Sequence, residues 1–275
     1  MMTIPNRSRW PSEIPGYDWL VTDDGSRTLC NLATEETFHS GCGALTESLV
    51  VYLENSEIGP KLRCGSPCRV LEIGFGTGTT FFLAAALAEL NQTSLLYHGI
   101  ESNPLPASTF IDLQLAECVS NPTGIGLPNW IRAESEAVAL IVSKLVGQFS
   151  QRFRWNETKP NPQMRLSSRV DLFLHLQDAR VAVEMLARQI AVQESEQFDA
   201  VFFDPFCPDH CPELWTAEVL TNCYSALCAG GRFVSYCVKS SVRRRLAAIG
   251  FDVQKRLGPK GGKREVLVAR KPQGV

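Results

Sequence analysis

The chain has 275 residues and a formal net charge of −2, and 44% of its residues are hydrophobic. This length and apolar content suffice to bury one sizeable core. The small net charge excludes a globally cationic surface, so any nucleic-acid contact would need a local basic patch. The chain lacks both a signal-peptide segment and the roughly 20 consecutive apolar residues of a membrane span. The composition therefore predicts a cytoplasmic protein with no membrane contact.

Ten cysteines are scattered through the chain. Without a secretory signal, buried thiols are the default. Cys64 with Cys68 and Cys207 with Cys211 are the closest pairs, and they are expected at opposite edges of a parallel sheet. A six-residue strand is about 20 Å long, so one zinc ion cannot bind both pairs. The sequence predicts no metal site.

The first part of the chain is polar and turn-rich up to about residue 30, and residues 41–54 then carry apolar side chains at helical spacing. We expect residues 1–60 to be an N-terminal helical extension that packs on a core domain of residues 61–275. Within that domain, residues 119–169 are polar and proline-bearing in their second half, which predicts an excursion from the core.

From Cys68 onward, strand-like and helix-like segments alternate. Such alternation predicts right-handed βαβ units and a parallel sheet. The last two strand-like segments, 250–258 and 264–270, are separated by a short Gly/Lys/Pro loop and predict a hairpin. The whole pattern predicts an α/β fold of the Rossmann-like class I methyltransferase type, with a seven-stranded, mostly parallel sheet that ends in an antiparallel pair.

A glycine-rich motif lies where the first of these strands turns into a helix. Its residues are Glu72, Gly74, Gly76, Thr77 and Gly78. Alternating glycines allow positive φ and let a ligand approach the backbone. A dinucleotide site would have its third glycine one residue later, in the pattern G-x-G-x-x-G. The motif therefore predicts a cradle for S-adenosylmethionine.

Acidic residues end the next two strands of this pattern. Glu101, followed by Ser102, is placed to accept hydrogen bonds from both ribose hydroxyls of an adenosyl ligand. Asp178 follows the third strand, where a carboxylate can face the adenine amino group. It also precedes a predicted helix that begins at Ala179, so an N-cap role is the alternative.

The most hydrophobic strand delivers Asp204-Pro205-Phe206 at its carboxyl end, beside the crevice where open α/β sheets bind ligands. This loop resembles the (Asp/Asn)-Pro-Pro-aromatic loop of amine methyltransferases, with Asp204 and Phe206 as the candidate catalytic residues. A carboxylate there can orient an amine and accept its proton. The alternative is that Asp204 only caps a turn.

Five segments resemble the methyltransferase module of MnmC-type enzymes, the tRNA 5-methylaminomethyl-2-thiouridine methyltransferases. They are residues 36–54, 71–82, 99–105, 198–216 and 243–265. The resemblance implies S-adenosylmethionine as cofactor and methylation of an aminomethyl group on the wobble uridine of tRNA. It also implies the tRNA anticodon stem-loop as partner, with no obligate protein partner evident, and substrate contacts from Glu36 and His39.

Two departures from the family pattern bear on these expectations. Pro205 stands where the family usually has glycine, which bears on how the amine is held. The chain also carries no counterpart of the FAD-binding oxidase half of the bifunctional enzyme. We therefore expect the aminomethyl uridine to be made elsewhere, or the substrate to differ from that of the fused enzyme.

The C-terminal part of the chain concentrates basic residues, and the expected RNA contacts are Arg243, Lys255, Arg256, Lys263 and Arg264. Such a cluster can neutralise phosphates locally, although it can also be an ordinary solvated surface. Two other functions stay open at this point. One is an aminopropyltransferase resembling spermidine synthase, and the other is a non-catalytic RNA-binding protein of the same fold.

Overall fold

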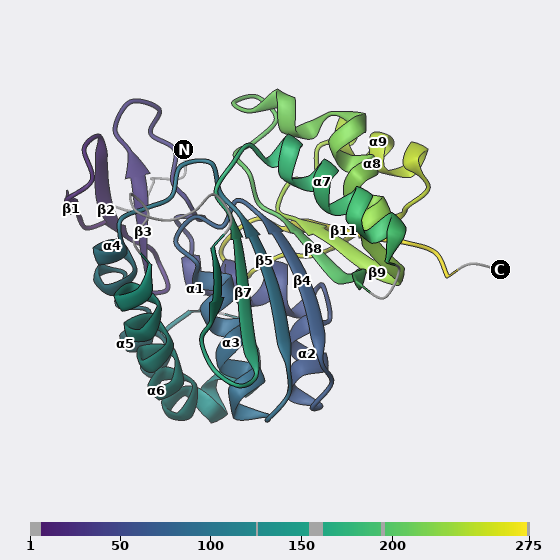
Figure 1. Cartoon of the computed structure of the whole chain (residues 1–275). Coiled ribbons are helices and arrows are strands. Elements are labelled where there is room, and N and C mark those ends of the chain that lie inside the picture. The colour runs from purple at the N-terminus through teal and green to yellow at the C-terminus, as the bar shows by residue number, and fades with distance from the viewer. Residues whose placement is uncertain (1–6, 125, 154–161, 194–195, 274–275) are drawn as a thin grey trace.

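The structure is a computed structural model that describes residues 7–124, 126–153, 162–193 and 196–273. A central sheet runs through the domain in the strand order β10-β11-β9-β8-β4-β5-β7-β6, with helices on both faces (Figure 1). Its strands are β4 (Cys68–Ile73), β5 (Leu95–Ile100), β6 (Gln163–Arg165), β7 (Val170–His175), β8 (Phe198–Phe203), β9 (Leu227–Ser235), β10 (Asp252–Leu257) and β11 (Glu265–Arg270).

The sheet confirms the predicted fold class but not the predicted number of strands. Strands β7, β5, β4, β8 and β9 are parallel, and β11 and β10 form the expected antiparallel pair at one edge. The prediction of seven strands is wrong because β6 pairs antiparallel with β7 at the opposite edge. This strand has three residues and a single buried side chain, Met164, so its sequence shows no usable alternation.

Two helical layers cover the sheet, and alternate residues of each strand face opposite layers. Val70 and Phe202 face one layer, whereas their chain neighbours Leu71 and Phe203 face the other. The first layer contains α1 (Ala44–Glu47), the π-helix η1 (Ser48–Glu54), α2 (Ile58–Arg63), α3 (Thr79–Leu90), α4 (Ala107–Asp112), α5 (Leu115–Ser120) and α6 (Asn129–Arg152). The second contains α7 (Ala179–Val192), the short 3-10 helix η3 (Pro212–Trp215), α8 (Ala217–Ala226) and α9 (Ser240–Ile249). Both faces of the central strands are therefore buried, as a parallel sheet requires.

The N-terminal segment is not wholly helical, in contrast to the prediction for residues 1–60. A small antiparallel sheet of β1 (Arg9–Pro11), β2 (Tyr17–Val21) and β3 (Arg27–Asn31) precedes the helices and lies beside the upper end of the main sheet (Figure 1). Its strands are short, and Trp19 and Leu29 are their main buried side chains. β1 buries no residue, β2 buries one and β3 buries three in succession, so none of them gives a period-two signal. Both side chains join the core of the first layer, so the segment packs on the domain.

The predicted excursion, residues 119–169, contributes the long helix α6 to the first layer. Phe149 of α6 packs edge-on against Phe82 of α3 and Phe110 of α4, with ring centres 5.5 and 4.8 Å apart. Residues 154–161 lie outside the described part of the chain. In the part that is described, no helix is both long and apolar enough to cross a membrane.

Phe82 tests whether α6 is an integral layer of this domain. Phe82→Ala removes a fully buried ring that touches both α4 and α6, and we expect it to lower the free energy of unfolding by about 3 to 5 kcal/mol. Urea unfolding followed by circular dichroism measures this decrease. Leu257→Ala, at a side chain that is 85% exposed, is the control and should change stability by less than about 0.5 kcal/mol. Equal effects of the two substitutions would show that the α6 layer is loosely attached.

Candidate active site

A cavity of about 1110 Å³ opens at the carboxyl ends of β4, β5, β7 and β8. This is the edge of an open α/β sheet where ligands bind, and the volume exceeds the common range for small-molecule sites. Its wall combines the glycine-rich loop after β4, the acidic ends of β5 and β7, the loop after β8 and residues 35–40 of the N-terminal segment. The cavity therefore has room for a nucleoside cofactor and part of a second substrate.

The glycine-rich loop passes very close to the loop that follows β8. Gly74 has a φ of +89°, and a Cβ atom on it would lie 2.7 Å from the carbonyl oxygen of Asp204. A side chain there is excluded by both backbone conformation and space. Gly76 and Thr77 line the cavity, whereas Gly78 precedes α3 with a φ of +66° and is absent from the cavity wall. Of the predicted cradle residues, Gly78 thus shapes the turn and does not face the ligand space.

Glu101 lies at the end of β5 and is almost fully enclosed. Its Oε2 accepts a hydrogen bond from the backbone N–H of Gly76, and its Oε1 accepts one from that of Asn103, both at 2.9 Å. Burial raises the pKa of this carboxyl above its usual value. Each carboxylate oxygen keeps a further lone pair for an additional donor. The predicted contact with two ribose hydroxyls is therefore sterically and chemically compatible, and Ser102 lines the same part of the cavity.

Glu72 lies deeper in the cavity. Burial raises the pKa of its carboxyl to about 8. The hydroxyls of Tyr97 and Thr80 lie near this carboxyl, but its buried Oε2 accepts no hydrogen bond of standard geometry from the described residues. A buried acceptor without a donor is costly, and a ligand ammonium group would supply that donor. The amino-acid end of S-adenosylmethionine carries such a group, so the residues present fit this cofactor.

Asp178 follows β7 and caps α7. Its Oδ1 accepts a hydrogen bond from the backbone N–H of Arg180 at 2.8 Å, and its carboxylate forms an ion pair with the same residue at 2.6 Å. The capping alternative is thus observed directly. Asp178 also lines the cavity, and its contact with adenine stays a prediction.

Asp204 lies half-buried in the loop after β8. The hydroxyl of Tyr52 on η1 donates a hydrogen bond to Asp204 Oδ1. Burial, and after it the charge of Glu47, raise the pKa of Asp204 well above its usual range. Burial likewise raises the pKa of Glu47, which accepts a hydrogen bond from the backbone N–H of Ser40 at 2.6 Å. A carboxyl of raised pKa that faces a cavity is a candidate proton-transfer group.

The rest of this loop is held by one side chain of the second helical layer and one that follows β9. Trp215 of η3 is buried, and its indole N–H donates to the carbonyl oxygen of Phe206 at 2.9 Å. The hydroxyl of Tyr236 donates to the carbonyl oxygen of Pro205 at 2.9 Å. These bonds fix the backbone, while the ring of Phe206 stays 41% exposed and contacts Phe38 edge-on, with ring centres 5.9 Å apart.

The predicted substrate contacts from the N-terminal segment, Glu36 and His39, both line the cavity. Glu36 accepts a hydrogen bond from His210, which follows β8. His39 is buried beside Thr28, with its Nδ1 3.2 Å from the hydroxyl oxygen. Burial lowers the pKa of His39 to about 4, so this imidazole is neutral at neutral pH. The structure thus places both residues at the cavity, and their contact with substrate stays a prediction.

The basic residues of the C-terminal part lie along the carboxyl edge of the sheet, and one of them reaches the cavity. Lys263 lines the cavity, with its ammonium group 3.7 Å from the ring centre of Tyr236. Lys255 forms an ion pair with Glu265 at 2.6 Å, and Arg243 donates to the carbonyl oxygen of Val238. A separate pair, Arg256 and Arg264, is exposed near the end of β10 and the start of β11.

Three residues that shape the site were not predicted from the sequence, namely Glu47, Tyr52 and Tyr236. Glu47 and Tyr236 line the cavity, and Tyr52 holds Asp204. Glu47 and Tyr52 lie within segment 36–54, which carries the family resemblance. That resemblance could have indicated them as site residues. Tyr236 follows β9, and the sequence alone gives no sign that its hydroxyl reaches the loop after β8.

Comparisons with known proteins agree with this geometry. Residues 141–272 match a family model described as S-adenosyl-L-methionine-dependent methyltransferase. A crystal structure of MNMC2 from Aquifex aeolicus superimposes with a TM-score of 0.67 at 27% identity, covering 97% of this chain and 74% of that chain. The family model covers just under half of the chain, and together with the structural match it supports an S-adenosyl-L-methionine-dependent methyltransferase. This confirms the predicted fold class, enzyme class and cofactor.

Curated relatives carry the name tRNA 5-methylaminomethyl-2-thiouridine biosynthesis bifunctional protein MnmC. The protein from Aromatoleum aromaticum is 26% identical over 255 residues, which is 90% of this chain and 34% of that protein. The one from Actinobacillus pleuropneumoniae is 42% identical over 79 residues, or 29% of this chain and 12% of that protein. The methyltransferase thus spans about a third of the length of the first of these relatives. The resemblance to MnmC-type enzymes is confirmed, and neither alternative function is favoured.

Glu101 tests the cofactor site. Glu101→Ala removes a charged acceptor, and we expect it to weaken S-adenosylmethionine binding by about 1.5 to 3 kcal/mol, the scale of charge-assisted hydrogen bonds. Titration calorimetry measures the affinity. Glu184→Ala on α7, at a carboxylate paired only with Arg188 on the same helix, is the matched control and should bind normally. An unchanged affinity in a folded Glu101→Ala variant would remove the carboxylate from the cofactor site.

Proposed function

We propose that this methyltransferase transfers a methyl group from S-adenosylmethionine to the aminomethyl nitrogen on the wobble uridine of tRNA. The substrate assignment rests on the names of the MnmC relatives. The observation that carries it in this chain is Asp204, a half-buried carboxyl of raised pKa whose backbone lies against the glycine-rich loop. A proton acceptor at that position is what an aliphatic amine substrate needs.

The chemistry of the acceptor explains the need. An aliphatic amine has a pKa near that of lysine, about 10, so at neutral pH it is an ammonium without a free lone pair. Nucleophilic attack on the sulfonium methyl requires the neutral amine. An ordinary carboxylate is a weak base, whereas the raised pKa of Asp204 brings its basicity closer to that of the amine. Asp204 therefore accepts the proton and orients the remaining N–H bonds, while the bound cofactor supplies the methyl group.

The cavity is also electrostatically suited to these ligands. Glu47, Glu72, Glu101 and Asp204 all line it; Glu47 and Glu72 are buried, and Glu101 and Asp204 are half-buried. Buried carboxylates favour cations, and both the cofactor sulfonium and the substrate ammonium are cationic. The same carboxylates would repel an RNA phosphate, so only the modified base enters the cavity and the backbone stays outside.

The tRNA backbone would then contact the exposed basic residues at the carboxyl edge of the sheet. Arg256 and Arg264 lie on this side, next to the cavity residue Lys263. Arginine suits phosphate because its planar guanidinium donates two parallel hydrogen bonds. The anticodon stem-loop as partner, independence of an obligate protein partner and a cytoplasmic location belong to the same proposal.

Asp204→Asn tests the proton acceptor. We expect methyl transfer to fall by about 10² to 10⁴, the range for a positioned acid–base group, because the amide keeps size and hydrogen bonding but cannot take a proton. Single-turnover reactions with tRNA carrying aminomethyl-uridine measure the rate, and cofactor affinity should change little.

The pH dependence follows from the direction of the pKa shift. Raising the pH ionises Asp204 and also makes more of the amine neutral, so the rate of the parent enzyme should rise with pH. The variant retains only the second effect and should recover partly at high pH. A variant as fast as the parent at neutral pH would show that Asp204 only caps the turn and does not accept the proton.

Substitution of Arg256 and Arg264 tests the proposed RNA-binding surface, because neither residue lines the cavity. Changing both to Ala should weaken tRNA binding and reduce the slope of log affinity against log salt by about one unit for each phosphate that is no longer neutralised. Fluorescence anisotropy across a salt series measures both quantities. The matched control changes Lys144 on α6 and Arg188 on α7 to Ala, which removes the same charge from other faces. Identical slopes for the two double variants would show that the C-terminal arginines are only solvated.

A further inference from the structure

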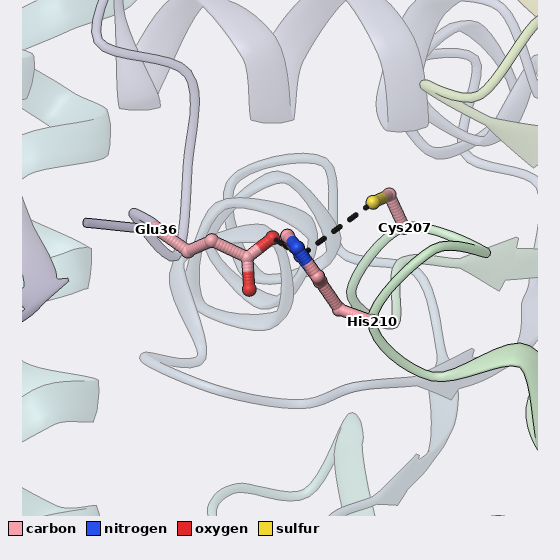
Figure 2. A group of neighbouring side chains, drawn as sticks. All are labelled: Glu36, Cys207 and His210. Atoms are coloured by element: carbon pink, nitrogen blue, oxygen red, sulfur yellow. Dashed lines mark hydrogen bonds and ion pairs between the residues drawn. The ribbon is translucent and has the colours of Figure 1, made fainter. Parts of the chain in front are cut away.

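Three side chains with metal-binding atoms converge at the mouth of the cavity. Glu36 comes from the segment between β3 and α1, whereas Cys207 and His210 come from the loop between β8 and η3 (Figure 2). A carboxylate oxygen, the thiol sulfur and an imidazole nitrogen all lie within 4.8 Å of one another. The sequence pairs Cys207 with Cys211 and predicts no metal site, and nothing in it indicates that Glu36 reaches this loop.

The local backbone explains how Cys207 and His210 approach each other. The carbonyl oxygen of Cys207 accepts hydrogen bonds from the N–H groups of His210 and Cys211, at 2.9 and 3.0 Å, which closes a single tight turn. This turn brings Cys207 Sγ within 3.7 Å of His210 Nδ1. Bonds of about 2.3 Å from zinc to sulfur and about 2.0 Å to nitrogen, at a tetrahedral centre, place those ligand atoms about 3.5 Å apart. The pair is therefore already spaced for zinc.

The third ligand is oriented toward the same point. His210 Nδ1 and Glu36 Oε1 form a direct hydrogen bond, which a metal ion would replace with two coordinate bonds (Figure 2). The side chains of His210 and Glu36 are 50% and 22% exposed, so an ion can enter from solvent and a water molecule can fill the fourth position. Thiolate, imidazole and carboxylate together select zinc over the hard cations magnesium and calcium.

We propose that Glu36, Cys207 and His210 bind one zinc ion at the mouth of the cavity. The Cys207 thiol, and His210 where it is protonated, release their protons to solvent as the ion binds. This site is separate from the proposed methyl transfer and does not depend on it.

The position of the ligands indicates what the ion would do. Glu36 lies two residues before Phe38, and Cys207 directly follows Phe206, and the rings of Phe38 and Phe206 are in edge-on contact. An ion at this site would join the N-terminal segment to the loop that carries Asp204. It would thereby hold the aromatic pair at the cavity mouth together, as a positioning element outside the reacting atoms.

Metal titration of the full chain, without tRNA or cofactor, tests the site. The protein is stripped with a chelator, kept reduced with a phosphine, and titrated with Zn²⁺ or with Co²⁺ as a spectroscopic probe. We expect one ion per chain, thiolate-to-cobalt charge-transfer absorption in the near ultraviolet, and a rise in melting temperature with Zn²⁺. Because outer-shell changes alone cost metal sites about 10- to 100-fold in affinity, removing the ligand in Cys207→Ser should weaken Zn²⁺ binding at least tenfold.

Two further variants keep the test decisive. His210→Ala retains the thiol but should also weaken Zn²⁺ binding and shift the cobalt spectrum, and it stands in for Cys207→Ser if that variant does not fold. Cys64→Ser removes an exposed thiol at the end of α2 and should leave binding unchanged. Absence of stoichiometric Zn²⁺ binding by the parent, or equal affinity in Cys207→Ser, His210→Ala and Cys64→Ser, would overturn the proposal. Neither result bears on methyl transfer, which is measured separately with tRNA.

Discussion

The backbone contact between Gly74 and Asp204 is the constraint on which the site depends. Strands β4 and β8 are adjacent and parallel, and the N–H of Asp204 still donates to the carbonyl oxygen of Ile73 at 2.9 Å after β8 has ended. The two loops therefore leave the sheet side by side, and only glycine at position 74 leaves room for them. One loop belongs to the cofactor cradle and the other carries the proposed proton acceptor. Their separation is set by main chain, which reduces the cost of aligning donor and acceptor for in-line transfer.

Buried negative charge is the second determinant, and it follows from the first. The same edge collects Glu72 from β4, Glu101 after β5 and Asp204 after β8, and Glu47 reaches it from α1. Burial raises the pKa of each of these carboxyls, which means that the protein by itself stabilises their charged forms poorly. Cationic ligands reverse this penalty when they bind. Burying these carboxyls thus lowers the stability of the free protein, and the resulting cavity is complementary to a sulfonium and an ammonium.

The parts of this design that are local in sequence were predictable, and the parts that depend on distant contacts were not. The strand, glycine-rich turn and helix around Gly74 lie within about 20 residues, so periodicity and turn chemistry identify them. Glu101 and Asp204 follow because parallel strands deliver their carboxyl ends to one edge. In contrast, Tyr52 is 152 residues away from its partner Asp204, and Glu36 is 174 residues away from His210. The short strands β1, β2 and β6 bury at most one side chain each, and β3 buries three in succession, so none of them produces an alternating pattern.

These distant contacts share one origin, since Glu36, Phe38, His39, Glu47 and Tyr52 all come from the segment that precedes β4. The glycine-rich loop and the acidic residues proposed to hold the cofactor all come from the sheet and the loops at its carboxyl edge. The side chains of this N-terminal segment line another part of the cavity wall. Among them, Phe38 lies against both Gly76 and the ring of Phe206. A Cβ on Gly76 would lie 3.2 Å from the Phe38 ring, so the segment sits directly on the cradle. The proposed cofactor contacts therefore come from the sheet, whereas the space left for the proposed acceptor base is set by the N-terminal segment together with the loop after β8.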